Sequence, residues 1–182
     1  MKKVLAIFML CGLFLSLNLF ALTSCVRIEP TGDLKMVDNY GSIDDLIKDS
    51  PVIVVGTVDS ENNEFVWGEV PFATTTFKIE TCIRGDVTGI ITILQTKSNE
   101  DPFLNNGNRM VLFLEKYDGP ITEDAYVVKG LYQGQYTIKG TKIVKNIDNM
   151  LTGDEVLQNI ETLTARADVL GYVLKPAVPI SK

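Results

Sequence analysis

The chain has 182 residues, a formal net charge of −6 at pH 7 and no histidine. The lack of histidine excludes Ser-His-Asp and Cys-His catalysis, histidine zinc sites and the usual proton shuttle at neutral pH. Because a net negative chain repels phosphate backbones, we do not expect nucleic acid as a partner.

The first 25 residues predict export. Met1-Lys2-Lys3 is basic, and the 19 residues Val4–Leu22 carry no charge and are mostly apolar, which is typical of a secretory signal peptide. The run closes on Leu22-Thr23-Ser24-Cys25, which resembles the lipobox of bacterial lipoproteins: an aliphatic residue, two small residues and a cysteine. The alternative is an uncleaved transmembrane helix, because 19 uncharged residues are nearly long enough to span a bilayer.

The lipobox resemblance implies a lipid anchor. In that family the cysteine sulfur receives a diacylglyceryl group, and a dedicated peptidase cuts just before the cysteine, here between Ser24 and Cys25. Two acyl chains on one cysteine anchor a protein stably. We therefore expect an extracytoplasmic protein that is held on the cell membrane by its lipid, since a negative chain has no attraction to anionic headgroups. No cofactor is expected besides the covalent lipid on Cys25.

Removing the first 24 of the 182 residues leaves 158, enough for one domain with a sizeable core. With Cys25 blocked by its thioether, Cys82 is the only free thiol left, so no intramolecular disulfide is expected. We expect Cys82 to be a small core residue, with an intermolecular disulfide as the alternative. The predicted segments are the signal peptide (1–24), the lipidated cysteine and a flexible tether (25–41), a single domain (42–172) and a frayed tail (173–182).

The domain is predicted to begin with a short helix and a central strand. Ser42 is a suitable helix cap, and Pro51 favours extended geometry at the residue before it, which ends the helix. Val52–Val58 is apolar on both faces at first, which predicts a well-covered strand, and Gly56 within it indicates a bulge or bend. A polar, acidic excursion follows at residues 59–69.

From Thr74 the residues alternate, which predicts a half-buried strand that ends at the turn Arg84-Gly85-Asp86. One face of this strand is expected to hold Thr75, Phe77, Ile79, Thr81 and Ile83, with Cys82 on the other face. Further strands are predicted at Ile90–Gln95, Arg109–Glu115, Tyr126–Val128, Gln135–Ile138 and Lys142–Val144.

A second helix is predicted to follow the strands. Thr152 and Glu155 match a capping box, apolar residues then recur at helical spacing, and Gly171 occupies the position of a C-terminal cap. The fold class is therefore mainly β (α+β). We expect a small antiparallel OB-like barrel or coiled sheet of five to seven strands, flanked by a short N-terminal helix and a long C-terminal helix.

Three stretches resemble the netrin-like domains, the family of the metalloproteinase tissue inhibitors. They are Asp49–Val58, Phe77–Gly85 and Gly107–Leu114. The resemblance covers about residues 43–170 and implies an OB-type barrel with flanking helices. Those inhibitors bind the protease zinc through the free amine and carbonyl of an N-terminal cysteine that disulfides hold in place. Here Cys25 carries the lipid and has no disulfide partner, so the resemblance implies the fold more than the inhibition.

Phe65, Trp67 and Phe72 are the candidate ligand-binding residues. They bring aromatic rings into a polar segment, and aromatic residues near the mouth of an OB-type barrel are a plausible platform for a sugar or a peptide. The alternative is that they fold back and cover the end of the barrel. Arg84-Gly85-Asp86 spells an integrin-recognition tripeptide, but the same residues suit a tight turn.

The loops are rich in carboxylates, which are able to act as general acids and bases or to hold calcium when they converge. No calcium-loop, phosphate-loop or nucleophile motif is present, so we assign no catalytic residue and no metal ligand. The sequence predicts a non-catalytic binding module of the bacterial cell envelope, with an envelope protein or a glycan as its ligand. The alternatives are an envelope hydrolase that uses loop carboxylates and an inhibitor-like module.

Overall fold

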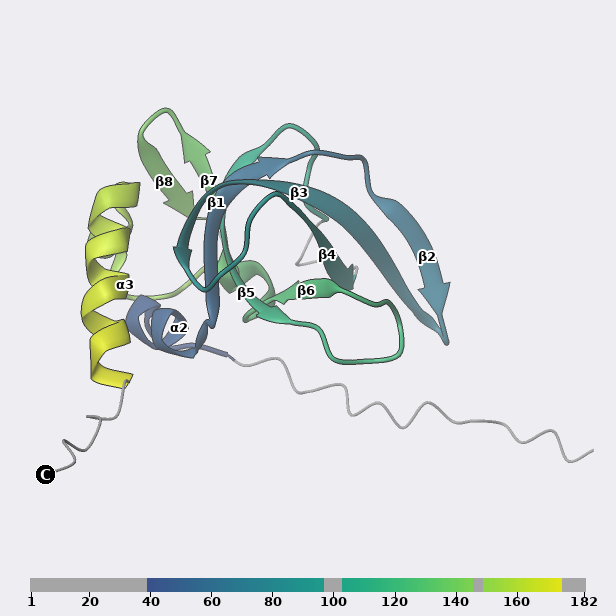
Figure 1. Ribbon diagram of the computed structural model, residues 1–182, viewed down its shortest axis with the longest axis horizontal. Coiled ribbons are helices and arrows are strands. Elements are labelled where there is room, and N and C mark those ends of the chain that lie inside the picture. Colours follow the sequence, from purple (N-terminus) through teal and green to yellow (C-terminus); the bar gives the residue numbers. More distant parts are fainter. Residues whose placement is uncertain (1–38, 97–102, 146–148, 175–182) are drawn as a thin grey trace, which may run out of the picture. The chain divides into compact units, whose positions relative to one another are not determined.

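The computed structural model describes residues 39–96, 103–145 and 149–174, without the side chains of five of them (Figure 1). The predicted signal peptide, the cleavage site at Ser24 and Cys25, and residues 26–38 of the predicted tether lie outside this part of the chain. Among the described residues, no helix is long and apolar enough to cross a membrane.

Eight strands form one sheet. They are β1 (Val52–Val58), β2 (Asn63–Trp67), β3 (Val70–Arg84), β4 (Ile90–Thr96), β5 (Arg109–Lys116), β6 (Ala125–Val128), β7 (Gln135–Lys139) and β8 (Lys142–Lys145). The pairings run β1-β3-β4-β6-β5, and β5 pairs back onto β1, so these five strands close a barrel. Strand β2 extends from β3, and the β7–β8 hairpin extends from β5. The predicted mainly β class is confirmed, as a five-stranded closed barrel with two helices.

One pairing in the barrel is parallel, between β4 and β6. The prediction of an entirely antiparallel sheet is therefore wrong at this place. A closed ring of five strands has an odd number of pairings, so the strand direction cannot alternate at every step and one pair must run parallel. Counted along the chain, the barrel strands have the order 1-2-3-5-4, which is the order of an OB-type barrel.

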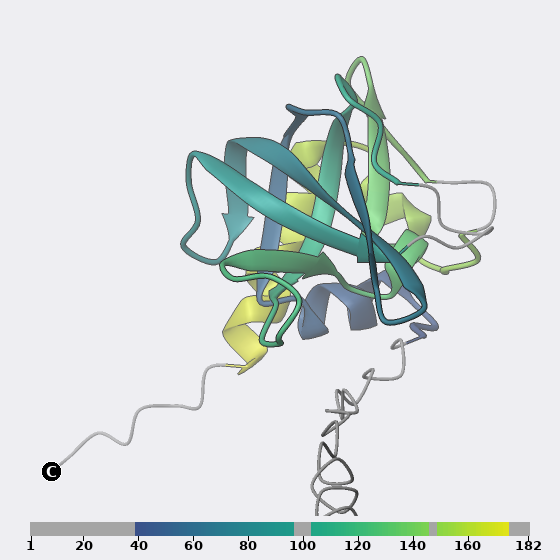
Figure 2. The ribbon, with the colours of Figure 1, turned by 90° about the vertical axis from the view of Figure 1, so that its right-hand side faces the viewer.

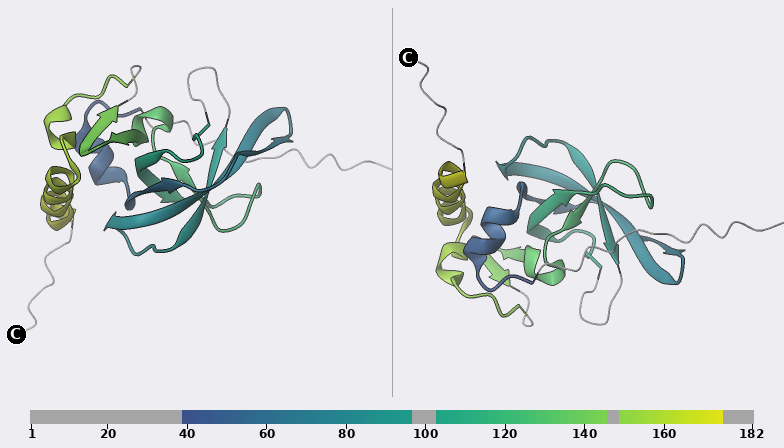
Figure 3. Two further views of the ribbon diagram at one scale, coloured as in Figure 1. Left: turned by 90° about the horizontal axis from the view of Figure 1, so that it is seen from above. Right: turned by 90° about the horizontal axis from the view of Figure 1, so that it is seen from below.

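Strands β1 and β5 lie between two apolar layers. Val54 and Leu112 belong to the cluster inside the barrel, which also contains Phe77. Val55 and Phe113 face the opposite way and join the cluster that contains the helices. Both helices accordingly lie on one side of the barrel, as the views from above and below show (Figure 3). Burial on both faces explains why these two strands read as almost continuous apolar runs.

The pairing of β1 with β3 contains two register shifts, one of them between Val55 and Gly56. A Cβ added at Gly56 would lie 2.2 Å from the Lys78 carbonyl oxygen, so glycine is needed where β3 crosses closely. Between the two shifts the predicted alternation of β3 fails. Thr81 is exposed, whereas Cys82 is half-buried and packs against the cluster inside the barrel. Bulges displace side chains from one face to the other, and a strictly alternating pattern cannot anticipate them.

Two helices and two 3₁₀ turns complete the domain: α2 (Ile43–Asp49), α3 (Ile160–Leu174), η1 (Leu131–Gly134) and η2 (Asp154–Leu157). The Ser42 side chain caps α2 by accepting a hydrogen bond from the Asp45 backbone N–H, at 3.2 Å. The backbone of Ser50, just before Pro51, is already extended.

The predicted capping box of the second helix is wrong. The Thr152 hydroxyl donates to the Gly41 carbonyl, and the Thr152 backbone forms a bridge with Ser42, so Thr152 is already engaged. The helix begins later, where the Asn159 side chain accepts a hydrogen bond from the Thr162 N–H at 2.9 Å. Gly171 lies inside α3 and does not cap it. The apolar spacing correctly predicts the buried positions Leu163, Ala167 and Leu170 of α3. The helix begins later than predicted because Thr152 is bonded to Gly41 and cannot cap it.

Candidate functional site

A third apolar cluster lies apart from the two main clusters, between the β2–β3 hairpin and the loop that joins β5 to β6. We call it the hairpin cluster. It consists of Phe65, Trp67, Val70, Phe72, Leu94, Tyr117, Ile121, Ala125 and Val127. Figure 2 looks onto this end of the domain, with the helices behind the barrel.

The turn of the hairpin places the three predicted aromatic residues together. Strands β2 and β3 are joined by two residues, and only the first of these, Gly68, has a positive φ, of +64°. This register sets Phe65 opposite Phe72 and Trp67 opposite Val70. The Phe65 and Phe72 rings are stacked, with centroids 6.0 Å apart and planes 19° apart. All four side chains therefore lie on one face of the hairpin.

The loop from Tyr117 to Asp124 supplies the facing side of the cluster. The Tyr117 backbone N–H donates to the Ala125 carbonyl at 2.9 Å, and the Tyr117 hydroxyl accepts from the Ile121 N–H at 3.3 Å. A side chain at Gly119 would collide with the Tyr117 ring. The loop thus folds around Tyr117 and presents Tyr117 and Ile121 to the hairpin.

The three candidate residues differ in exposure. Phe72 is only 4% exposed, so it forms the base of the hairpin cluster. Phe65 and Trp67 are half-buried, and Val66 between them is 69% exposed on the other face of β2. The sequence expectation of a platform fits Phe65 and Trp67, whereas Phe72 fits the alternative of a covering residue. The sequence did not point to Tyr117 and Ile121, because the residues around them (Asp118, Gly119 and Pro120) are typical of a polar surface loop.

The hairpin and the Tyr117 loop, which supply the cluster, are rich in exposed carboxylates. Residues 63–70 and 116–125 contain five exposed acidic side chains, Glu64, Glu69, Asp118, Glu123 and Asp124, and a single basic one, Lys116. Lys116 is itself paired with Asp124 at 3.0 Å. Asp59 and Glu61 lie before the hairpin, where Glu61 accepts a hydrogen bond from the Asn106 side chain at 3.0 Å. The segments that hold the half-exposed aromatic surface are therefore acidic.

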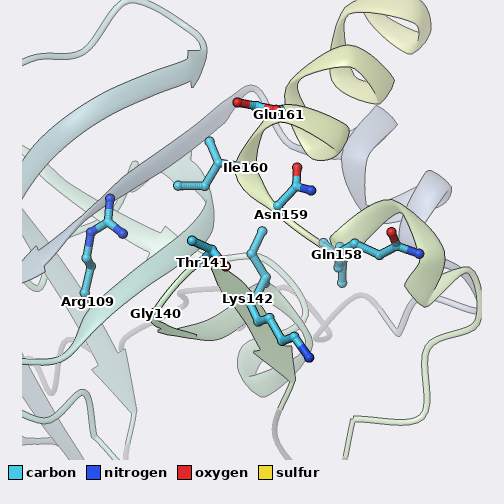
Figure 4. Close-up of a pocket in the computed structure, with 10 residues that line it drawn as sticks. Arg109, Gly140, Thr141, Lys142, Gln158, Asn159, Ile160 and Glu161 are labelled. Atoms are coloured by element: carbon cyan, nitrogen blue, oxygen red, sulfur yellow. The ribbon is translucent and has the colours of Figure 1, made fainter.

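A groove of about 850 Å³ lies at another place, between the β7–β8 hairpin, the start of β5 and the start of α3 (Figure 4). Apolar Ile143, Leu157 and Ile160 contribute to its lining, together with Arg109. The Arg109 guanidinium already pairs with Glu80 at 2.7 Å. Burial raises the pKa of Glu80, but hydrogen bonds from Arg109 and Thr57 outweigh it and hold that pKa below its ordinary value.

Two carboxylates outside the loops are kept ionised by arginine partners. The hydrogen bond from Arg166 lowers the pKa of Asp44, and the hydrogen bond from Arg109 lowers that of Glu80 against the effect of burial. A general acid at neutral pH needs a raised pKa, so neither of these two residues fits that role. Among the described residues, no group of three or more cysteine, aspartate or glutamate side chains is placed to hold a metal ion.

The Arg84-Gly85-Asp86 tripeptide lies at the end of β3, and Arg84 serves the fold. The Arg84 guanidinium donates to the Ile47 carbonyl of α2 and, at 2.6 Å, to the Ala167 carbonyl of α3. Gly85 has a φ of +94°, as a tight turn requires. The arginine thus joins both helices to the barrel, which favours the turn interpretation over the adhesive one.

The first described residues are fastened to the barrel. The Gln133 side chain accepts from the Tyr40 N–H and donates to the Asn39 side chain, each at 2.9 Å. The Tyr40 hydroxyl donates to Asp49 at 2.5 Å, and Asp49 pairs with the buried Lys129 at 2.8 Å. Burial and, second, the hydrogen bond to Asp49 raise the pKa of Tyr40. The chain is therefore held in place before α2 begins.

The sequence matches no protein-family model, and no curated protein is significantly similar to it.

Proposed function

We propose that this protein is an exported lipoprotein, held on the outer face of the cytoplasmic membrane by a diacylglyceryl group on Cys25. Its barrel acts as a non-catalytic binding module of the bacterial cell envelope. The hairpin cluster is the observation that carries the binding role, because Phe65 and Trp67 leave aromatic surface exposed outside the main core. Aromatic residues of this kind are favoured anchors at binding surfaces.

The position of the cluster supports a ligand-binding role. OB-type barrels bind ligands on the face of their second and third strands, between the loops that follow the first and fourth strands. In this barrel those strands are β3 and β4, which contribute Phe72 and Leu94. The flanking connections are the β2 excursion, with Trp67, and the Tyr117 loop. The cluster therefore occupies the place where this architecture holds its ligands.

The netrin-like resemblance of the sequence remains part of this proposal for the fold alone. An OB-type strand order and two packed helices support it. Inhibition of a metalloprotease is not proposed, because a lipidated Cys25 would be held at the membrane and has no disulfide partner to hold it in a protease site.

The anchor is tested by Cys25→Ser in the producing cell. Without the thiol there is no acceptor for the diacylglyceryl group, so the variant should lose label from radioactive fatty acid and should either leave the membrane or remain as the uncut precursor. The measurement is detergent phase partitioning with gel mobility, and Cys82→Ser is the matched control that should behave like the native chain. A shortened Cys25→Ser product that still partitions with lipid would contradict the anchor.

The binding role is tested by photo-crosslinking in intact cells. A benzoylphenylalanine at the exposed Asn63 lies on the same face of β2 as Phe65 and Trp67, and one at Thr141 lies at the tip of the β7–β8 hairpin. We expect a discrete crosslinked species from position 63 that disappears when Trp67→Ala is added, and none that depends on Trp67 from position 141. If crosslinking at both positions is equally diffuse and indifferent to Trp67, the hairpin cluster is not a binding surface.

A further inference from the structure

We infer that the hairpin cluster recognises a basic protein segment, with lysine or arginine side chains lying between its aromatic rings and its carboxylates. This inference rests on the proposed binding function and names the class of partner. It is carried by charge complementarity, by the exposed aromatic surface and by an arrangement of the same kind within this domain.

The charge around the cluster selects the sign of the partner. The hairpin (residues 63–70) and the Tyr117 loop with its flanks (residues 116–125) hold five acidic residues and one lysine, and that lysine is paired with Asp124. The whole chain adds to this field, since its formal charge of −6 becomes −8 once Lys2 and Lys3 leave with the signal peptide. A cationic partner is attracted by this field, whereas anionic partners, such as nucleic acids and acidic lipids, are repelled.

The aromatic surface adds a second attraction for the same class of ligand. Ammonium and guanidinium groups bind over the faces of Trp, Tyr and Phe rings, and Trp is the strongest of the three. Trp67 and Phe65 are half-buried, so each ring retains exposed surface. Carboxylates next to them, such as Glu69 in the hairpin turn and Asp118 beside Tyr117, compensate the charge of a bound cation.

The domain already contains one cation held in this way. The Lys116 ammonium lies 5.0 Å from the centre of the Tyr126 ring and 3.0 Å from the Asp124 carboxylate. Lys116 stands at the end of β5, directly before the loop that supplies Tyr117. A ring and a carboxylate thus share one lysine at the edge of the cluster, and the neighbouring hairpin turn carries the same two kinds of group in Trp67 and Glu69.

The negative charge near the hairpin cluster is not shared by the other hairpin of the domain, β7–β8. The β7–β8 hairpin contains Lys139, Lys142 and Lys145 and no acidic residue. The two hairpins therefore have opposite charge, and a basic ligand has reason to choose only one of them.

The test uses the lipidated full-length protein in neutral detergent and decalysine as the probe. Trp67 is the only tryptophan of the chain, so its fluorescence reports directly on the site. The double variant Glu69→Lys with Asp118→Lys removes charge at the cluster. The matched control, Asp86→Lys with Glu161→Lys, makes the same change of net charge at exposed positions of the turn after β3 and of α3. Decaglutamate and an uncharged soluble glycan of peptidoglycan type complete the set.

We expect decalysine to change the Trp67 fluorescence. The double variant at the cluster should weaken decalysine binding roughly tenfold or more, whereas the control pair should change the affinity about twofold or less. Raising the salt to about 0.5 M should weaken it as well. Equal losses in both double variants would overturn the inference, because binding would then follow net charge alone. So would salt-insensitive binding of the glycan, or of a second copy of this chain, in place of decalysine. In those cases a Trp67-dependent crosslink at position 63 would leave the proposed binding function supported, whereas its absence would count against both proposals.

Discussion

Gly56 illustrates how much one missing side chain decides at the residue scale. Its backbone lies so close to β3 that a Cβ would approach the Lys78 carbonyl oxygen to 2.2 Å and the Phe77 ring to 2.7 Å. The register of β1 against β3 shifts at this residue. Sequence reasoning anticipated a bulge or bend here, because glycine interrupts an apolar strand. It could not identify the crossing residues, since these come from a strand more than twenty positions away.

Gly56→Ala is expected to destabilise the domain by about 1–3 kcal/mol, the usual cost of overpacking, because neither the Lys78 backbone nor the buried Phe77 ring can withdraw cheaply. The measurement is the free energy of unfolding from denaturant titration. Gly41→Ala is the control, since a Cβ there meets nothing within 4 Å and the residue has no positive φ. Its effect should stay within about 0.5 kcal/mol. Equal effects of the two substitutions would show that Gly56 is not needed for the close crossing.

The candidate site shows the same limit of sequence reasoning. Phe65, Trp67 and Phe72 stood out because aromatic residues are conspicuous in a polar stretch. Their division into a buried base and an exposed surface depends on the two-residue turn at Gly68, which sets Phe65 opposite Phe72. The polar residues around that turn concealed β2 as a strand. The burial of β2 alternates, with Phe65 and Trp67 half-buried, but the exposed residue between them, Val66, is apolar, so the sequence itself does not alternate in polarity.

At the scale of elements, the two helices depend on each other as much as on the barrel. Arg166 of α3 pairs with Asp44 of α2 through two hydrogen bonds, the Nε–Oδ1 bond being 2.9 Å long. Arg84 joins carbonyl groups of both helices to the end of β3. Helical periodicity predicted which residues of α3 face inward, but the start of the helix was set by distant partners that occupied Thr152. Caps are therefore the least predictable part of these elements.

The contact between α2 and α3 predicts a dependence of stability on acid. The hydrogen bond from Arg166 is the main cause that lowers the pKa of Asp44 from its ordinary value of 3.8. A carboxyl group whose pKa is lower in the folded state stabilises the fold when ionised, and this contribution is lost as the pH falls below about 4. Asp44→Asn should therefore lower stability at pH 7 and reduce the loss of stability between neutral pH and about pH 3.

Thermal unfolding across this pH range measures the effect, and Asp86→Asn serves as the control because Asp86 is an exposed residue of a turn. The native chain and the Asp86→Asn variant should lose the same amount of thermal stability over this pH range. If Asp44→Asn loses as much thermal stability between neutral pH and about pH 3 as the native chain, other carboxyl groups account for the acid dependence and the pairing with Arg166 contributes little.

At the scale of the whole molecule, closure of the barrel depends on which strands pair, and the sequence of a single strand does not show its partners. Periodicity located the barrel strands β1, β3, β4, β5 and β6 to within a few residues. Periodicity could not predict the order of the strands in space. Strand β6 lies between β4 and β5, parallel to β4 and antiparallel to β5. Local pattern determines which segments are strands, whereas pairing depends on contacts between segments far apart in the chain. The mainly β class was therefore predictable, and the single parallel pair was not.

If Cys25 is anchored as proposed, the hydrogen bonds of Asn39 and Tyr40 to Gln133 determine where a pull from the membrane enters the domain. A pull from the membrane side first loads the hydrogen bonds of Gln133, and then α2, before it reaches β1. Strand β1 is bonded along both edges, to β3 and to β5. A force along β1 must shear two ladders at once and cannot unzip them bond by bond. Under the proposed anchor, the load therefore enters the barrel through a strand that is bonded along both edges, and the hairpin cluster lies outside this path.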